Sequence, residues 1–215
     1  MSLLTDQVKT QVKESLTDLK SPVKIIVFTQ TLECHFCQQT RELIEDIGGL
    51  SDLITVEVYD FVADAGQAEE YGIDKIPAIA IIGQEDYGIR FYGIPAGYEF
   101  TSLIHALRLV GGAGSQLDQA TIDELNGLAR PIHMQVFVTP TCPYCPQAVV
   151  LGYEMAYASP NVRADGIESS EFPQLAIKYQ VAGVPRTVIN EQTYIEGAAP
   201  LPMVMDKVRE ALAKE

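Results

Sequence analysis

The residues most able to do chemistry in this sequence are four cysteines in two C-x-x-C pairs, Cys34/Cys37 and Cys142/Cys145. A thiolate attacks a disulfide to form a mixed disulfide, and a second thiol three residues away can then attack that intermediate and release the product. A free thiol has a pKa of about 8.5 and is only roughly 3% thiolate at pH 7, so the surroundings of the first cysteine decide its reactivity. The spacing predicts dithiol–disulfide exchange.

Three other interpretations of the pairs compete with this one, and the third stays open. Two C-x-x-C knuckles can bind zinc, which would make this a non-catalytic zinc-binding module, but such knuckles usually lie within about 20 residues of each other. Here 104 residues lie between Cys37 and Cys142, and we expect no metal site. In the second interpretation the pairs are structural disulfides, which are rare in the cytosol. In the third, only one pair is active.

The two pairs belong to a duplicated sequence. An apolar segment precedes each pair, and a proline follows 43 residues after its first cysteine. Four landmarks are each repeated after 108 residues: Cys34 and Cys142, Cys37 and Cys145, Tyr71 and Tyr179, Pro77 and Pro185. One register kept over some fifty residues indicates two copies of one unit. The glycine-rich segment 111–114 marks their boundary, which predicts units at 1–112 and 113–215.

Each unit is expected to fold from the same series of helices and strands. An apolar strand ends at the cysteines, and the following helix presents unpaired N–H groups that favour an anion. The ranges in the first unit are 2–19, 36–47 and 98–109 for helices and 24–29, 55–59, 78–82 and 87–92 for strands. In the second unit the helices are expected at 116–129, 144–157 and 201–213, and the strands at 132–138, 162–167, 186–190 and 192–196. This order predicts an α/β fold in which each unit is a four-stranded mixed sheet flanked by helices.

The charge of the chain excludes some partners. The net charge is −14 over 215 residues, with no concentrated basic segment to hold phosphates, so we expect no nucleic-acid and no membrane partner. Residues 1–20 place apolar side chains at helical spacing, which indicates an amphipathic helix rather than a secretory signal. No stretch approaches the roughly 18 apolar residues of a membrane span. We therefore expect a soluble, cytoplasmic protein.

The residues around the cysteines carry a resemblance to a known family. The sequence CPYC at 142–145, after an apolar strand, is similar to the active site of glutaredoxins. The pairs Ile76-Pro77 and Val184-Pro185 resemble the cis-proline of the thioredoxin superfamily. Two such units, with CHFC at 34–37 in the first, resemble the glutaredoxin-like protein disulfide oxidoreductases of thermophilic archaea and bacteria. The resemblance covers nearly the whole chain and implies two tandem thioredoxin-like units.

The resemblance also implies roles for the site residues. Cys34 and Cys142 would be the nucleophiles, and Cys37 and Cys145 the resolving thiols. Pro77 and Pro185 would be cis and would face the disulfides, each presenting the backbone of the preceding residue, Ile76 or Val184, to the substrate.

The implied activity is the reversible reduction, formation or isomerisation of disulfides in protein substrates. It would use no cofactor besides the redox-active disulfides, with a thioredoxin-reductase-like flavoprotein as electron donor. The alternative is an electron carrier to a peroxidase, because the chain also resembles the doubled thioredoxin-fold domain of the flavoproteins that reduce peroxiredoxins. In those domains the first unit usually lacks its cysteines, and here it keeps them.

The sequence differs from glutathione-binding glutaredoxins in two places, and these differences change the expected reductant. The second unit has Gly-Val-Pro-Arg at 183–186 instead of the Thr-Val-Pro of glutathione-binding glutaredoxins. The region after its last strand, 197–200, also lacks the glycines and paired acids of those proteins. We therefore expect glutathione to be a poor reductant.

Charged residues near the pairs are further candidates. Glu57 and Asp165, 108 residues apart, lie in the strands expected beside the cysteine-bearing ones and could relay a proton, although a solvated acid is an equally good interpretation. Glu33 immediately precedes the first nucleophile, where an anion opposes thiolate formation, and neutral Thr141 holds that position in the second unit. Arg186 would favour the second thiolate if it points toward the disulfide. We expect the second pair to be the more reactive.

Overall fold

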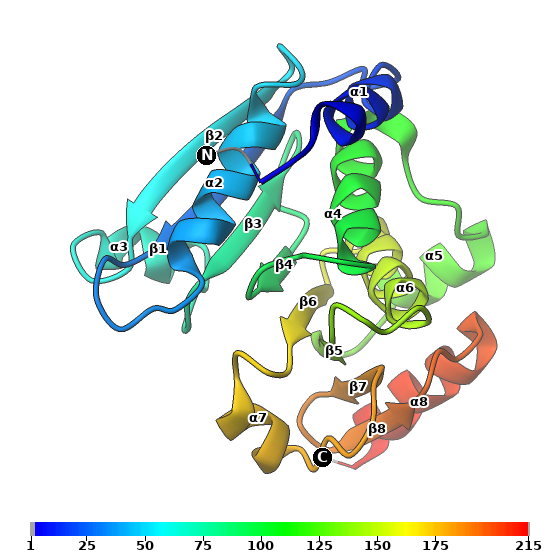
Figure 1. Ribbon diagram of the computed structural model, residues 1–215. Coiled ribbons are helices and arrows are strands. Elements are labelled where there is room, and N and C mark those ends of the chain that lie inside the picture. Colours follow the sequence, from blue (N-terminus) through cyan, green and yellow to red (C-terminus); the bar gives the residue numbers. More distant parts are fainter. Residues whose placement is uncertain (1–2, 215) are drawn as a thin grey trace.

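Each half of the chain forms a small mixed sheet in the computed structural model, which describes residues 3–214 (Figure 1). The first half contains α1 (Asp6–Ser15), β1 (Val23–Thr29), α2 (Cys37–Gly48), β2 (Ile54–Asp60), α3 (Ala65–Glu70), β3 (Ala78–Ile82), β4 (Ile89–Tyr92) and α4 (Glu99–Arg108). The second half contains α5 (Gln119–Asn126), β5 (Ile132–Val138), α6 (Cys145–Ala158), β6 (Val162–Glu168), α7 (Pro173–Lys178), β7 (Arg186–Ile189), β8 (Thr193–Glu196) and α8 (Leu201–Ala213). The predicted α/β fold with two four-stranded mixed sheets is confirmed.

The same strand pairing occurs in both halves. The cysteine-bearing strand β1 is parallel to β2 and antiparallel to β3, and β5 is parallel to β6 and antiparallel to β7. The hairpins β3–β4 and β7–β8 complete the two sheets. The two halves therefore repeat the same structure, with the 108-residue offset found in the sequence.

The two sheets are joined edge to edge. Strand β4 of the first half pairs in parallel with β6 of the second, from Ile89 opposite Ala164 to Tyr92 opposite Ile167. The result is one eight-stranded sheet in the order β2-β1-β3-β4-β6-β5-β7-β8. This pairing covers one open edge of each half, and an open edge otherwise invites association.

Helices cover both faces of the sheet, because side chains on a strand alternate between its faces. Ile25 and Val27 pack into the larger core beneath α2, α4 and α6, whereas Ile26 and Phe28 pack into the smaller core beneath α3 and α7. The strands β1, β3 and β5 are consequently apolar in most positions, as in other sheets that are covered on both faces.

The helices α1 and α5 are shorter than the sequence pattern predicts. The hydroxyl of Thr5 accepts a hydrogen bond from the Val8 N–H, and the Asp118 carboxylate accepts one from the Thr121 N–H. These N-caps start the helices at Asp6 and Gln119, later than the expected 2 and 116; residues 1, 2 and 215 lie outside the described residues.

The chain passes between the halves through the π-helical segment η1 (Leu109–Ala113), where Gly112 has a φ of 115°. A left-handed φ of this kind favours glycine. The division at 112 and 113 stays a prediction. Within residues 3–214, every helix is too short or too polar to span a bilayer.

Candidate functional site

Both cysteine pairs lie where an apolar strand ends and a helix begins. Strand β1 leads to Cys34 and β5 to Cys142, and the helices α2 and α6 begin at Cys37 and Cys145. Each pair is joined in a disulfide. The unpaired N–H groups and the dipole of a helix N-terminus stabilise a nearby anion. A thiolate released by reduction would therefore form at a favourable position in each half.

The first cysteine of each pair is the more accessible one. Cys34 is half-buried, whereas Cys37 is 3% exposed. Cys142 is 8% exposed, and Cys145 is completely buried. An incoming disulfide can reach the first sulfur before the second, which is the order that the nucleophile and resolving roles require.

The two prolines lie beside the cysteine-bearing strands. The peptide bonds Ile76–Pro77 and Val184–Pro185 are both cis, the geometry that the resemblance implied. The residues that follow the prolines pair with those strands, Ala78 opposite Phe28 and Arg186 opposite Phe137. In the second half, the carbonyl oxygen of Val184 lies 3.7 Å from Sγ of Cys142. The backbone before that proline is thus in contact with the disulfide.

The charges beside the two pairs differ from the expectation in one respect. Arg186 is 6% exposed, and its guanidinium donates a 2.6 Å hydrogen bond to Glu196 and lies over the ring of Tyr194. Its charge is compensated there and does not support the Cys142 thiolate in the way we expected. Glu33 does precede Cys34 directly, in a left-handed conformation with φ 58°.

The two proposed relay carboxylates bond to basic groups rather than to cysteines. Glu57 accepts hydrogen bonds from Lys24 and Tyr59, and the Lys24 partner lowers the pKa of Glu57. Asp165 is completely buried, with His133 Nε2 at 2.6 Å and Arg163 Nε at 2.9 Å. Burial alone would raise the pKa of Asp165, but these two partners hold it below its usual range. None of these contacts supports a relay role for either acid.

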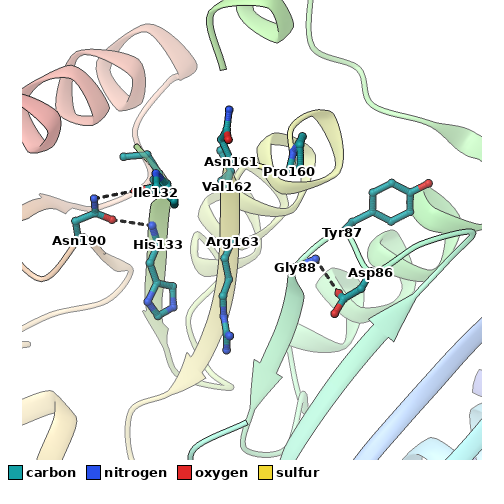
Figure 2. Close-up of a pocket in the computed structure, with 11 residues that line it drawn as sticks. Asp86, Tyr87, Gly88, Ile132, His133, Pro160, Asn161, Val162, Arg163 and Asn190 are labelled. Carbon is teal, nitrogen blue, oxygen red and sulfur yellow. Dashed lines mark hydrogen bonds between the residues drawn. The ribbon is translucent and has the colours of Figure 1, made fainter. Parts of the chain in front are cut away.

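The hollow drawn in Figure 2 lies at the opposite end of the strands from the second disulfide. It measures about 370 Å³ and is lined where β5 and β6 begin, whereas Cys142 follows the end of β5. His133 and Arg163 extend side by side from these strands, and Arg163 also donates hydrogen bonds to the Gly72 carbonyl and the Tyr92 hydroxyl. Arg163 thus connects the two halves beside this hollow, and His133 holds Asp165 within the second half.

Three buried or half-buried acids where the two halves meet were missed by the sequence analysis. Glu99 is 1% exposed, and burial raises its pKa to about 7 although it accepts a hydrogen bond from Ser102. Burial also raises the pKa of Glu171 to about 7, with the neighbouring Glu168 adding to the effect. An acid at a helix start or strand end normally lies at the surface, so the sequence holds no signal for their burial.

The four cysteines do not form a common metal site. Among residues 3–214, no three His, Cys, Asp or Glu side chains gather in a group that could hold a metal ion. The two pairs lie in separate halves of the sheet, so the zinc-binding interpretation finds no four-thiolate cluster.

Comparison with known proteins agrees with this geometry. Residues 132–210 match the family model described as thioredoxin domain. The crystal structure of a protein disulfide oxidoreductase from Aeropyrum pernix is 28% identical and covers 97% of this chain and 94% of its own, with a TM-score of 0.92. The NTD_N/C domain of the alkylhydroperoxide reductase AhpF from Enterococcus faecalis is 25% identical and covers 97% of this chain and 99% of its own, with a TM-score of 0.85.

A curated relative gives the same result on sequence. The alkyl hydroperoxide reductase protein AhpF of Pseudomonas aeruginosa is 29% identical over 208 residues, which is 96% of this chain. The chain spans 37% of the length of that relative. The tandem thioredoxin-like fold and the resemblance to protein disulfide oxidoreductases are both confirmed.

Proposed function

We propose that this protein is a thiol–disulfide oxidoreductase that reduces, forms or isomerises disulfides in other proteins through two C-x-x-C sites. One observation carries the proposal: each half places a disulfide at a strand–helix junction beside a cis-proline, with its first cysteine more exposed than its second. This arrangement exposes one sulfur to a partner and keeps the other for release of the product.

In the reducing direction, the thiolate of Cys34 or Cys142 attacks one sulfur of the substrate disulfide. The substrate S–S bond breaks, a mixed disulfide forms, and one substrate thiolate leaves. The thiolate of Cys37 or Cys145 then attacks the sulfur of the first cysteine, and the second substrate thiolate leaves with its electron pair. The protein has lost two electrons and the substrate has gained them. In the second half, the backbone at Val184 is placed to hold the substrate chain against Cys142.

The substrates follow from this chemistry, and the electron donor is proposed from the resemblance to the oxidoreductase family. Substrates are proteins with accessible disulfides, the electron donor is a thioredoxin-reductase-like flavoprotein, and no cofactor beyond the two disulfides takes part. We place the activity in the cytoplasm, because catalytic C-x-x-C pairs are common there and structural disulfides are not.

A second candidate function is favoured by the comparisons. The likeness to the alkyl hydroperoxide reductase protein AhpF covers almost the whole chain, so the two sites could pass electrons to a peroxidase instead of to many proteins. In that case one partner would be reduced far faster than unrelated disulfides.

Reduction of insulin by dithiothreitol tests the proposal. The full chain should accelerate insulin reduction, and the variant with both Cys34→Ser and Cys142→Ser should not. An inactive wild-type chain that binds stoichiometric zinc would overturn the proposal in favour of a metal-binding module. Rapid transfer to a peroxiredoxin with little insulin reduction would favour the electron carrier.

A further inference from the structure

The edge-to-edge joining of the halves makes the surroundings of the two disulfides unequal. Strands β2 and β6 are equivalent in the repeat, since each lies beside the cysteine-bearing strand of its half. In the second half, β6 is covered because it pairs with β4. In the first half, β2 is the outermost strand of the sheet, with β1 as its neighbour. The space beside β2 is therefore open where the space beside β6 is filled.

Two acids at equivalent positions in the repeat differ in burial for this reason. Asp60 ends β2 and is half-buried, whereas Glu168, 108 residues later, ends β6 and is 3% exposed. The first half packs onto the Glu168 region closely: a Cβ added to Gly93 would lie 2.7 Å from the Glu168 Cβ. Asp60 has no neighbouring strand on its outer side in the described chain, because β2 is the edge of the sheet.

The open space beside β2 is a hollow of about 620 Å³ whose wall includes both Cys34 and Cys37. Ligand sites for small molecules commonly have volumes of about 300–1,000 Å³. Polar side chains line most of it, with Gln39 and Arg41 on the first turns of α2 and Asp60 at the end of β2. The hollow is thus large enough for a small molecule and lies directly against a redox-active disulfide.

We propose that this hollow binds a low-molecular-weight disulfide of the amino-acid type, such as cystine, and presents it to Cys34. The proposal rests on the proposed function and adds a substrate class for the first site. An amino acid carries one carboxylate and one ammonium group, and the wall holds one charged side chain of each sign, Arg41 and Asp60. Arg41 is paired with Glu45, and Oδ1 of Asp60 accepts hydrogen bonds from the Val62 and Ala63 N–H groups, so a ligand would be held by the remaining polar atoms of these side chains. The Nε of Arg41 donates to Glu45, and a guanidinium has further N–H donors for a carboxylate. Neutral amides such as Gln39 also line the wall.

The reaction at this site is ordinary exchange. The Cys34 thiolate attacks one sulfur of cystine, whose S–S bond breaks, and one cysteine leaves as the mixed disulfide forms. The Cys37 thiolate then displaces the second cysteine from Cys34 and closes the protein disulfide. Two electrons pass from the protein dithiol to cystine, and dithiothreitol or the flavoprotein donor restores the dithiol.

Two full-length variants with a single active pair separate the sites. Cys142→Ser/Cys145→Ser keeps the first pair, and Cys34→Ser/Cys37→Ser keeps the second. Each is reduced, freed of reductant and mixed with cystine, glutathione disulfide or insulin, and the formation of the protein disulfide is followed in time. The rate with cystine divided by the rate with insulin should be at least about tenfold higher for the first pair than for the second, because a positioned substrate reacts faster.

The chain offers a matched control for the hollow. Gln39 and Gln147 are exposed and stand 108 residues apart on α2 and α6, and only Gln39 lines the hollow beside Cys34. In the first-pair protein, Gln39→Trp should lower the rate with cystine about tenfold and leave alkylation of Cys34 by iodoacetamide within about twofold. Gln147→Trp should change neither. Arg41→Gln should slow cystine but not cystamine, the diamine disulfide that has no carboxylates.

The outcomes distinguish the two proposals. If the first pair reduces insulin but shows no preference for cystine, or if Gln39→Trp does not slow cystine, the binding site is wrong and the proposed function stands. A glutathione disulfide rate equal to that of cystine would also contradict the amino-acid selectivity. If neither pair reacts with any disulfide, the proposed function itself fails.

Discussion

The backbone N–H of Tyr98 donates a hydrogen bond of 3.0 Å to the carbonyl oxygen of Pro140, so the first half of the chain holds the loop that carries Cys142. The loop before Cys34 lies beside β2, which is the outer strand of the sheet in the described part of the chain. Two sites with the same cysteine spacing and the same proline geometry are thereby placed in different surroundings.

The contact around Pro140 can be broken at one glycine. A Cβ at Gly97 would lie 2.2 Å from the Pro140 carbonyl oxygen, and Gly97 has a φ of 59°. We expect Gly97→Ala to destabilise the protein by about 2 kcal/mol or more and to slow reactions at Cys142, because the backbone of its loop must move. Urea unfolding and alkylation of the second-pair variant measure the two effects.

Gly197 is the matched control, since its φ of 78° is left-handed like that of Gly97 and no atom lies within 4 Å of an added Cβ there. Gly197→Ala should cost about 1 kcal/mol, because only the left-handed backbone opposes it. Equal effects of the two substitutions would show that packing on Pro140 does not matter.

The charge of Glu33 should slow the first nucleophile. Glu33→Gln removes an anion next to Cys34 and should raise its alkylation rate at pH 7 about twofold, because more of the thiol is ionised. Thr141→Glu places an anion at the equivalent position and should slow Cys142 by a similar factor. Alkylation by iodoacetamide in the single-pair variants reports both, and a change of the same sign in the two would contradict the charge argument.

Glu99 should make stability depend on pH. Its pKa is about 7 in the folded protein against an ordinary 4.5, because the carboxyl is buried. Below pH 4.5 the proton is bound in both states and the group has no effect. Between pH 4.5 and 7 the unfolded state loses the proton first, so stability falls as pH rises, by about 3 kcal/mol in total.

The variant Glu99→Gln cannot ionise and should lose this part of the pH dependence. The measurement is the free energy of unfolding in urea at several values between pH 4 and 8, for wild type and variant. A stability difference between them that is constant over this range would mean that Glu99 does not titrate there.

Asp165 and Glu57 occupy the same place in the repeat and should respond differently to loss of charge. Asp165→Asn leaves the partly exposed His133 and Arg163 facing a neutral group, and we expect a loss of about 1–3 kcal/mol. Glu57→Gln removes an exposed pair with Lys24, which should cost less than about 1 kcal/mol.

The low pKa of Asp165 gives its contribution a pH dependence. The stabilisation is present above the unfolded pKa of about 3.9 and is lost as pH falls through the lower folded pKa. The relay hypothesis is checked separately by comparing the pH profile of insulin reduction in the wild type with the profiles of Asp165→Asn and Glu57→Gln. Loss of a relay acid would shift the profile, whereas loss of a purely structural acid would change only the free energy of unfolding.

The electron donor provides a last test. Because the second site lacks the residues of glutathione-binding glutaredoxins, glutathione should reduce the disulfides poorly while dithiothreitol or a flavoprotein reductase reduces them well. A glutathione-coupled disulfide assay measures this directly, and turnover there comparable to that with dithiothreitol would contradict it.

Residue patterns along the chain are enough to specify the fold and the chemistry of each half. The C-x-x-C spacing defines the chemistry, the alternation from apolar strand to helix places it, and the 108-residue register shows that it is present twice. Periodicity and capping depend on residues close in the chain, and the spacings from Cys34 to Pro77 and from Cys142 to Pro185 can be counted without knowing which surfaces meet. The cis geometry at both prolines followed from the resemblance rather than from composition.

The differences between the halves arise from the way the halves pack together. The parallel pairing of β4 with β6 unites two sheets, buries Asp165 and Glu168, and leaves Glu57 and Asp60 at an open edge. Tertiary packing also raises the pKa of Glu99. From its position in the sequence Arg186 was expected to favour the Cys142 thiolate, but in the folded chain its guanidinium is paired with Glu196. Burial is a property of which surfaces meet, and two equivalent strands in one sequence acquire different surroundings as soon as one becomes internal and the other remains an edge.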